Sequence, residues 1–206
     1  MNAVPRNGIT QPPMSLESAL DEFPKDLMLR DGLVCQARPL EPGDHVAFHK
    51  FFTSLNAPEL LYIKHRVSEP EVVRAWCEQI DLGRNLPLLA WSGGDIVGVC
   101  TLHQSLGGWK RHIGRVSVHV HPKFRGRGLA QALVNEIVEI ARACSLEKLE
   151  AEFIGRQEGA MKVFGLLGFS ELVRLPEYVK DMQAITHDYV LMGIDLLTDE
   201  EYAGMG

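Results

Sequence analysis

The stretch from Val116 to Ala130 reads V-S-V-H-V-H-P-K-F-R-G-R-G-L-A, and it decides the fold. Val116, Val118 and Val120 alternate with polar residues, as a half-buried β-strand requires. Pro122 ends this strand because it has no N–H to donate. The sequence therefore predicts a strand, then a tight turn with two glycines and two arginines, and then a helix.

The segment after the turn has the apolar periodicity of an amphipathic helix. Its apolar stripe recurs every three to four residues and consists of Leu129, Leu133, Ile137, Ile140 and Cys144. The N–H groups of the first helical turn lack partners within the helix and, together with the helix dipole, attract an anion. The turn is therefore a candidate phosphate site.

Two well-known glycine-rich turns do not match this segment. A P-loop needs Lys-Ser/Thr where Leu129 and Ala130 stand, and a dinucleotide fingerprint needs a glycine where Gln131 stands. What remains is Arg125-x-x-Gly128-x-Ala130 after a valine-rich strand, and it resembles the acetyl-CoA signature Q/R-x-x-G-x-G/A of the GCN5-related N-acetyltransferase (GNAT) superfamily. A basic surface turn is the plainer interpretation of the hexapeptide alone.

A second motif extends the resemblance toward the C-terminus. Residues 160–169 follow A-x-x-x-F-x-x-x-G-F, which is similar to the superfamily pattern A-x-x-x-Y-x-x-x-G-F. The resemblance then covers about Leu27 to Leu196. It implies an α+β (mixed α/β) fold, with a mostly antiparallel, twisted sheet of six to seven strands that is splayed at its centre and flanked by about four helices.

Composition excludes several classes of protein. The chain has 206 residues, a net charge of −6 and a pI near 5.7, whereas general nucleic-acid binding needs a basic face. The four cysteines form no C-x-x-C pair, so we expect reduced, structural thiols, and no metal. No apolar run reaches the roughly 18 residues of a membrane span. We expect a cytoplasmic protein that does not bind membranes.

The chain divides into a flexible N-terminal arm (1–24), one domain (25–197) and a tail (198–206). Asp31-Gly32 predicts a first β-hairpin, and Ser68 with Glu71 has the spacing of a capping box. The predicted helices are His45 to Leu55, Ser68 to Leu82, the segment after Gly128, and Gln157 to Leu167. The predicted strands are Leu27 to Leu29, Leu33 to Ala37, Pro87 to Trp91, Ile96 to His103, Ile113 to Val120, Lys148 to Phe153, Ser170 to Leu175 and Asp188 to Leu196.

The resemblance also implies where the coenzyme binds. Its pantetheine arm would lie along the backbone of Val118, His119 and Val120. Its pyrophosphate would lie over the turn formed by Arg125, Gly126, Arg127, Gly128, Leu129 and Ala130. Gln157 takes the place of a family asparagine that touches the cofactor. Phe164 takes the place of a family tyrosine, and the resemblance implies that it also contacts the cofactor.

Two residues are candidate bases for deprotonating an amine. Glu152 lies on the polar side of the predicted strand Lys148 to Phe153, where a plain surface carboxylate is the alternative, and His119 has a suitable imidazole. His112 and His121 are weaker candidates. The usual acid is missing because Phe164 has no proton to give, so the thiolate leaves unaided or through water, or Tyr178 or Tyr189 donates, or catalysis has been lost.

The acceptor is an amine of unspecified kind. Its implied contacts are Phe51, Tyr62, Lys64, His65 and Arg66, with Lys110 and Arg111 in a nearby loop, although core packing or solvation explains each of them singly. The expected function is acetyl transfer from acetyl-CoA to a primary amine by direct attack in a ternary complex. The alternative is an inactive acyl-CoA-binding sensor or regulatory module. Edge strands also suggest a homodimer.

Overall fold

A computed structural model describes residues 15–56 and 67–197. One eight-stranded sheet runs through it in the order β1-β2-β3-β4-β5-β6-β8-β7. The strands are β1 (Lys25–Met28), β2 (Val34–Pro39), β3 (Asn85–Ser92), β4 (Asp95–His103), β5 (Ile113–Val120), β6 (Lys148–Ile154), β7 (Ser170–Lys180) and β8 (Thr186–Asp195). All neighbours are antiparallel except β5 and β6, which are parallel. The sheet exceeds the expected six to seven strands because both strands of the first hairpin join it.

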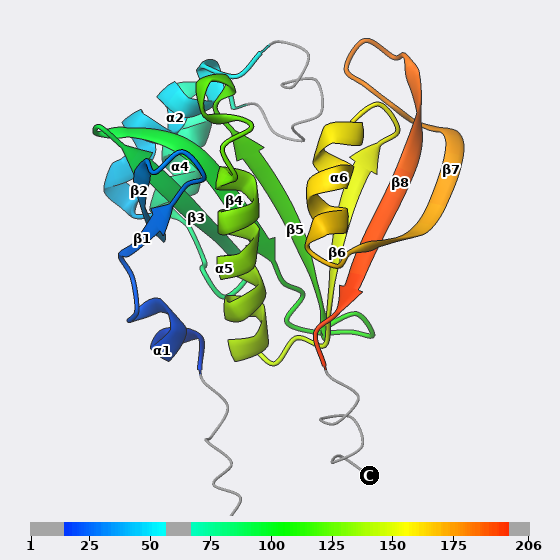
Figure 1. Cartoon of the computed structure of the whole chain (residues 1–206), viewed down its shortest axis with the longest axis horizontal. Coiled ribbons are helices and arrows are strands. Elements are labelled where there is room, and N and C mark those ends of the chain that lie inside the picture. Colours follow the sequence, from blue (N-terminus) through cyan, green and yellow to red (C-terminus); the bar gives the residue numbers. More distant parts are fainter. Residues whose placement is uncertain (1–14, 57–66, 198–206) are drawn as a thin grey trace, which may run out of the picture.

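Helices cover both faces of this sheet (Figure 1). The α-helices of the described residues are α1 (Leu16–Leu20), α2 (His45–Thr53), α4 (Pro70–Glu78), α5 (Leu129–Ala143) and α6 (Glu158–Leu166), and two short 3-10 helices are η1 (Pro42–Asp44) and η2 (Pro122–Phe124). In Figure 1, α5 and α6 lie in front of the sheet, and α2 and α4 lie behind it. The mixed α+β fold is as predicted.

The apolar stripe predicted for α5 packs on the sheet. Leu129, Leu133, Ile137 and Ile140 are each at most 2% exposed, while Cys144, just past the helix, is half-buried. The opposite face has its own core, in which aromatic side chains of α2 and small apolar ones of α4 cover β3 and β4. The sheet therefore separates two apolar cores, one beneath α5 and the other beneath α2 and α4.

The expected flexible arm is wrong for the part that the structure describes. Residues 16–20 form α1, where the Ser15 hydroxyl accepts a hydrogen bond from the Ser18 amide. Ala19 is 5% exposed within the main core, and Lys25 donates to Glu136 of α5 at 3.0 Å. The short apolar pattern of α1 gave too little periodicity to predict a helix, but docking against α5 stabilises it.

The capping box predicted at Ser68 is also wrong. Helix α4 begins at Pro70 with Glu69 as its N-cap residue, and it ends at Glu78, earlier than the predicted Leu82. Proline suits the first helical position because its missing N–H would have no partner there. After the helix, the Asp81 carboxylate accepts the Gly83 amide at 3.0 Å and holds a turn instead of a further helical turn.

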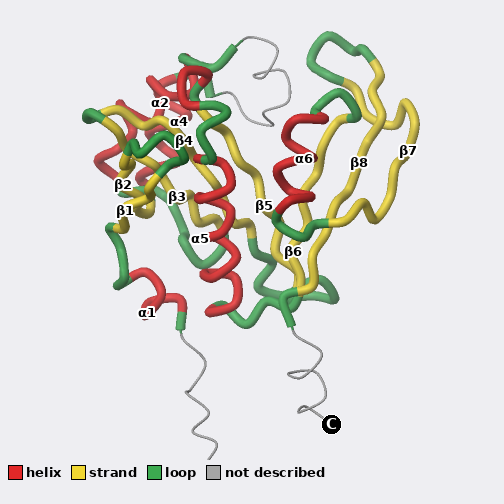
Figure 2. Tube along the Cα trace, viewed as in Figure 1, coloured by secondary structure: helices red, strands yellow, loops and turns green. Residues whose placement is uncertain are grey.

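The sheet splits between β5 and β6. Their parallel pairing joins Ile113 to Lys148, Gly114 to Leu149 and Arg115 to Glu150, and then it ends. Figures 1 and 2 show the two strands side by side at their lower ends and diverging toward their upper ends. The expected central splay is therefore present.

The register shows which backbone groups face this split. The His121 amide donates to the Val97 carbonyl at 2.9 Å, and antiparallel bonding alternates, so His119 is the next residue of β5 bonded to β4. Val118 and Val120 must then turn their N–H and C=O groups the other way, toward β6. Beyond the last β5–β6 pair, they form an open backbone edge.

Strand β7 forms one edge of the sheet and is irregular. Its pairing with β8 shifts register between Glu171 and Val173 and again between Leu175 and Val179. Pro176 lies within the second shift, and Glu177 has a φ of 50°. Most of the strand is exposed, including apolar side chains such as Leu172 at 56% and Tyr178 at 68%.

Candidate acyl-transfer site

The glycine-rich turn has the backbone that an anion site needs. Gly126 and Gly128 adopt φ values of 74° and 88°, in the left-handed region that favours glycine. Gly128 is the N-cap residue of α5, and the first helical bond runs from the Ala132 amide to the Gly128 carbonyl at 3.0 Å. The amides of residues 129–131 therefore point out of the helix end, where they can donate to a phosphate.

A basic residue that the sequence did not single out lies against this turn. Arg30, in the β1–β2 hairpin, donates its amide to the Arg127 carbonyl at 3.0 Å and its guanidinium to the Gln131 side chain at 2.8 Å. Asp31 binds Arg127 at 3.0 Å. Hairpin residues far away in sequence thus hold the turn in place, because the fold brings the first hairpin against the start of α5.

The side chain of Arg125 bonds to the backbone of β5. Its Nε donates to the Val120 carbonyl at 3.1 Å, at the end of the open β5 edge. Arg127 lies over the Phe124 ring, with its guanidinium carbon 5.5 Å from the ring centroid. These arginines therefore shape the turn and supply positive charge beside it.

The open edge corrects one of the expected pantetheine contacts. Val118 and Val120 present backbone groups to the split, whereas those of His119 belong to the β4 ladder. The His119 ring lies on the face of the sheet opposite α5, with its centroid 6.5 Å from that of Phe52 in α2. Only the two valines suit strand-like hydrogen bonding to an added chain.

Of the two predicted cofactor contacts after β6, Gln157 has a side-chain donor group and Phe164 is buried. Gln157 accepts the Ile154 amide through Oε1 at 2.9 Å, so its side-chain NH₂ group is the part that can donate to a ligand. Phe164 is 1% exposed and packs between Phe153 and Phe169, with centroid distances of 5.1 and 4.9 Å. Phe164 is a core residue here and does not line the split, contrary to the prediction.

Glu152 lies just beyond the last β5–β6 pair, Arg115 with Glu150, where the two strands begin to diverge. We call this place the mouth of the split. Glu152 is on the face opposite α5, accepts a hydrogen bond from the Tyr189 hydroxyl at 3.3 Å, and lies 3.6 Å from the Arg115 guanidinium. Burial, and then the charge of Glu152, raises the pKa of Tyr189 to about 12. Tyr189 therefore stays protonated near neutral pH, and its ring lies 6.1 Å from that of the exposed Tyr178.

Ser117 of β5 is a second polar residue beside the mouth of the split, and it was not predicted from the sequence. If the β5–β6 register is continued by two residues, Ser117 corresponds to Glu152 on the same face. Ser117 Oγ lies 3.4 Å from His103 Nε2, and His103 Nδ1 lies 2.8 Å from Asn85 Oδ1. The only sequence signal was the polar position of Ser117 between two valines.

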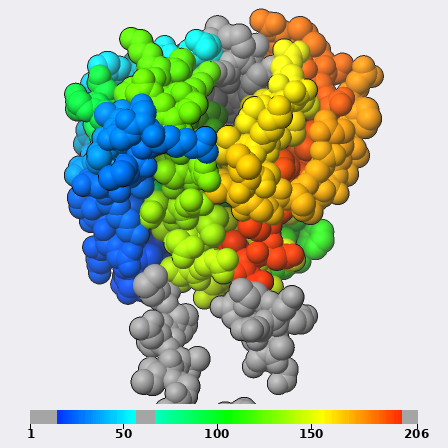
Figure 3. Space-filling view, viewed as in Figure 1, coloured from blue at the N-terminus to red at the C-terminus, as the bar shows by residue number. Residues whose placement is uncertain are grey.

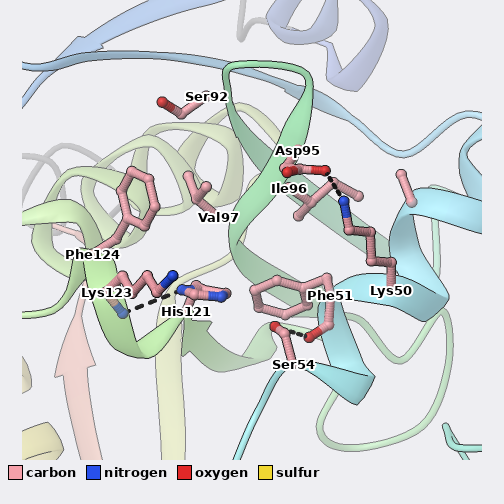
Figure 4. Close-up of a pocket in the computed structure, with 11 residues that line it drawn as sticks. Lys50, Phe51, Ser54, Ser92, Asp95, Ile96, Val97, His121, Lys123 and Phe124 are labelled. Carbon is pink, nitrogen blue, oxygen red and sulfur yellow. Dashed lines mark hydrogen bonds and ion pairs between the residues drawn. The ribbon is translucent and has the colours of Figure 1, made fainter.

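The other candidate histidines lie apart from Glu152. His121 accepts the Lys123 amide through Nδ1 at 3.2 Å, and burial together with the charges of Lys123 and Arg125 lowers its pKa. It lines a cavity of about 200 Å³ between α2 and η2, shown in Figure 4. His112 is at the far end of the sheet, where its carbonyl accepts the Glu147 amide at 2.9 Å.

The expected acceptor contacts have different outcomes. Phe51 lines the cavity of Figure 4, whose rim carries an ion pair of Lys50 with Asp95 at 2.6 Å. Lys110 binds Glu150 at 3.1 Å, on the same face as Glu152, while Arg111 lines a separate hollow at the opposite end of β5. Tyr62, Lys64, His65 and Arg66 lie outside the described residues.

Three further observations concern the described part of the chain. Within it, three or more His, Cys, Asp or Glu side chains nowhere gather as a metal site would need. The cysteines in it are all free thiols, and burial raises the pKa of each. Of its helices, none is long and apolar enough to cross a membrane.

In the space-filling view, the first hairpin lies over the upper part of α5 and reaches toward α6 (Figure 3). An open strand edge leading to a helix N-terminus suits a long ligand with an amide-rich arm and a pyrophosphate. The fold and the site are together those of an acyl-CoA-dependent transferase. The family model described as "Acetyltransferase (GNAT) family" matches residues 50–169, and the chain belongs to this family, whose cosubstrate is acetyl-CoA.

Solved structures with the same fold include the GNAT domain of S. lividans PAT, with a TM-score of 0.69 and 20% identity over 83% of this chain and 96% of that one. Another is a Salmonella typhimurium protein described as an acetyltransferase and solved with its cofactor acetyl-CoA. It has a TM-score of 0.68 and 20% identity, covering 80% of this chain and 95% of that one.

Among curated proteins, an L-amino acid N-acyltransferase of Escherichia coli is 29% identical over 39% of this chain and 49% of its own length. An L-methionine sulfoximine/L-methionine sulfone acetyltransferase of Salmonella typhimurium is 28% identical over 39% of this chain and 50% of its own length. The chain thus spans about half the length of these relatives.

Proposed function

We propose that this protein transfers an acetyl group from acetyl-CoA to a primary amine by direct attack in a ternary complex. The observation that carries the proposal is the continuous path from the open edge of Val118 and Val120 to the amides at the start of α5. The pantetheine amides would bond to the strand edge, and the pyrophosphate would accept from the helix N-terminus. This path ends at the mouth of the split, beside Glu152.

Glu152 is the proposed general base. An amine acceptor is mostly an ammonium ion near neutral pH and must lose a proton before it can attack a thioester. Glu152 is a carboxylate at the mouth of the split, and Tyr189 and Arg115 stabilise its charge and fix its position. His119 faces α2 and is the less suitable base, although its ring lies on the same face of the sheet.

The departing sulfur needs no side-chain acid in this proposal. Phe164 has no proton and is buried, and Tyr189, with its pKa raised to about 12, is a weak acid. A coenzyme A thiolate has a thiol-like pKa, so it can leave unaided and take a proton from water. Leaving-group protonation by Tyr189 is therefore not required.

The first experiment is calorimetric titration with acetyl-CoA, followed by a thiol-release assay against a panel of amines. The panel begins with L-amino acids and methionine sulfone, because the curated relatives are named for them, and continues with polyamines and peptide N-termini. Binding with acceptor-dependent thiol release supports the proposal. Binding without release from any acceptor favours the alternative, an acyl-CoA-binding sensor or regulatory module.

The variant Gly128→Val tests the anion site. A β-branched residue is strained at a φ of 88°, and its Cβ would lie 3.2 Å from Arg30 Cγ. We expect acetyl-CoA binding to fall at least a hundredfold while the far-ultraviolet circular dichroism stays native. The control is Gly107→Ala, at a glycine with open space around its Cβ position. Unchanged coenzyme affinity in Gly128→Val would refute the site assignment.

The variant Glu152→Gln tests the base. It keeps the shape of the side chain and removes the proton acceptor, so kcat should fall by roughly a hundredfold or more with little change in acetyl-CoA affinity. Glu171→Gln, an exposed carboxylate on β7, is the matched control. Wild-type turnover in Glu152→Gln at neutral pH would make Glu152 a surface carboxylate only.

A further inference from the structure

Three polar side chains lie beside the mouth of the split, across from Glu152, and the proposed reaction gives them no role. Asn85 on β3, His103 on β4 and Ser117 on β5 lie in a row across three adjacent strands on the face opposite α5. The row ends at Ser117, which corresponds to Glu152 across the split. A nucleophile between the strands would therefore have an ionisable carboxylate on one side and this row on the other.

The hydrogen bonds fix the direction in which a proton can move. Asn85 Oδ1 can only accept, so His103 must carry a proton on Nδ1 to make the bond of 2.8 Å. In the neutral imidazole, Nε2 is then an acceptor, and Ser117 donates its hydroxyl proton toward it over 3.4 Å. The Ser117 oxygen keeps lone pairs for a further donor. In hydrolytic enzymes, a histidine that is oriented by a third group takes the proton of a serine hydroxyl in the same way.

We propose that Ser117, backed by His103 and Asn85, takes the second proton from the acceptor nitrogen. This inference rests on the proposed acetyl transfer, in which an ammonium ion must lose two protons to become an amide. Glu152 removes the first proton and leaves a neutral amine. Ser117 is the catalytic group for the second proton, and His103 and Asn85 are positioning residues that act through it.

The amine nitrogen forms a bond to the thioester carbon, and the C–S bond breaks with its electron pair going to sulfur. The second N–H proton passes to Ser117 Oγ as the Ser117 proton passes to His103 Nε2, so the imidazole becomes an imidazolium that still donates to Asn85. The products are the amide, the coenzyme A thiolate, protonated Glu152 and protonated His103. Water then removes the two protons.

The charges around His103 allow this cycle. On β5, Arg115 stands opposite His103, and its guanidinium is within 3.6 Å of Glu152. Glu150 on β6 binds Lys110, so its charge is largely matched. On β3, the neighbours Asn85 and Pro87 are uncharged, and Arg84 just before them pairs with Asp81. An imidazole that donates through Nδ1 can still accept a proton at Nε2, so His103 can be neutral before the step and charged after it.

The kinetic test uses Ser117→Ala and His103→Gln, with Ser170→Ala on the exposed strand β7 as the matched control. We expect kcat to fall about tenfold to a hundredfold in both, with acetyl-CoA affinity within about twofold of wild type. The two losses should not add, because the residues act in one path. His103→Gln should also remove one ionisation from the ascending pH profile, and Asn85→Asp should move that ionisation to higher pH because a carboxylate favours the imidazolium. Wild-type kcat and pH profile in Ser117→Ala and His103→Gln would overturn the relay while leaving acetyl transfer intact.

A second measurement does not need turnover. Nitrogen-15 NMR of the histidine rings should show neutral His103 with its proton on Nδ1, and Ser117→Ala should shift the Nε2 resonance. A proton on Nε2, or an Nε2 resonance indifferent to Ser117→Ala, contradicts the relay. If wild-type protein releases no thiol with any amine, the proposed function fails, and this spectrum still decides whether the hydrogen-bonded row exists.

Discussion

At the scale of single residues, Tyr189 has a perturbed acidity that reports on Glu152. Burial is the largest cause that raises its pKa to about 12, and the negative charge of Glu152 is the next. A phenolate there would face a carboxylate, so removing the carboxylate should lower the pKa toward the ordinary value of about 10 without reaching it. The ring should stay mostly neutral in wild type at a pH where Glu152→Gln already forms phenolate.

The measurement is phenolate absorbance after stopped-flow jumps to about pH 11, read before the chain unfolds and corrected with Tyr189→Phe. Wild type should show only about a tenth of the Tyr189 phenolate at this pH, because its pKa is about 12, and Glu152→Gln should show a clearly larger fraction. Equal phenolate formation in the two proteins would mean that the carboxylate does not act on this ring.

The sequence indicated some site residues and not others, because strand alternation can be read from the chain while contacts between distant strands cannot. Glu152 was a candidate base because strand alternation placed it on the polar face, and its role stays a prediction. Phe164 was assigned to the cofactor because its motif position is occupied by tyrosine in relatives, but its apolar ring prefers the core between Phe153 and Phe169. Nothing in the sequence indicated a role for His103 or Asn85, because they approach each other and Ser117 only when β3, β4 and β5 pair in the sheet.

At the scale of elements, an ion pair joins β2 to the start of α2. Arg38 donates twice to Asp44, at 2.7 and 2.6 Å, and Asp44 is 8% exposed. Burial alone would raise the pKa of Asp44, but the bonds from Arg38 and from the Glu41 amide outweigh it and lower the pKa. We expect Asp44→Asn to lower the free energy of unfolding by about 2 kcal/mol, since it leaves the partly buried Arg38 charge with only the more distant Glu41 carboxylate, at 3.8 Å.

The pH dependence of this pair has a definite sign. The folded-state pKa of Asp44 is lowered, so its contribution is complete above the unfolded-state pKa of about 3.9 and is lost as the pH falls through the folded-state value. Urea unfolding at pH 7 and at stepwise lower pH should show wild type losing its advantage over Asp44→Asn below about pH 4. A constant difference across that range would contradict the assigned role.

The elements themselves were largely predictable because their patterns are long. The strand Ile113–Val120 was predicted with its observed bounds, and α5 and α6 began within a residue of expectation. Short elements were not: α1 has too few residues to show periodicity, and at α4 the proline at the first helical position outweighed the capping-box spacing.

At the scale of the whole molecule, three residue pairs join β5 to β6, and the two sheet halves diverge beyond them. A ligand bonded to the open edge should slow amide exchange there. We expect acetyl-CoA to increase protection of the Val118 and Val120 amides by a factor of ten or more, while His119, which already bonds to β4, changes little. Hydrogen exchange followed by NMR checks this alternation. Equal protection of the three residues would mean that the coenzyme does not add to the strand edge.

The overall architecture followed from one strand, turn and helix plus a resemblance, because that unit fixes the centre of the sheet. The identity of the acceptor does not follow in the same way. The family model and the strand edge concern the coenzyme, whereas acceptor contacts come from loops, and the expected contacts from Tyr62 to Arg66 lie outside the described residues. Cytoplasmic location and a homodimer stay predictions.

Strand β7 bears on how two copies could meet. A straight, unpaired outer strand would offer a ladder of N–H and C=O groups to any other chain, which is a known route to aggregation. Here Pro176 has no N–H, and the neighbouring backbone turns at Glu177, so the ladder is broken midway along the strand. Continuous sheet extension from this edge into another chain is thereby disfavoured.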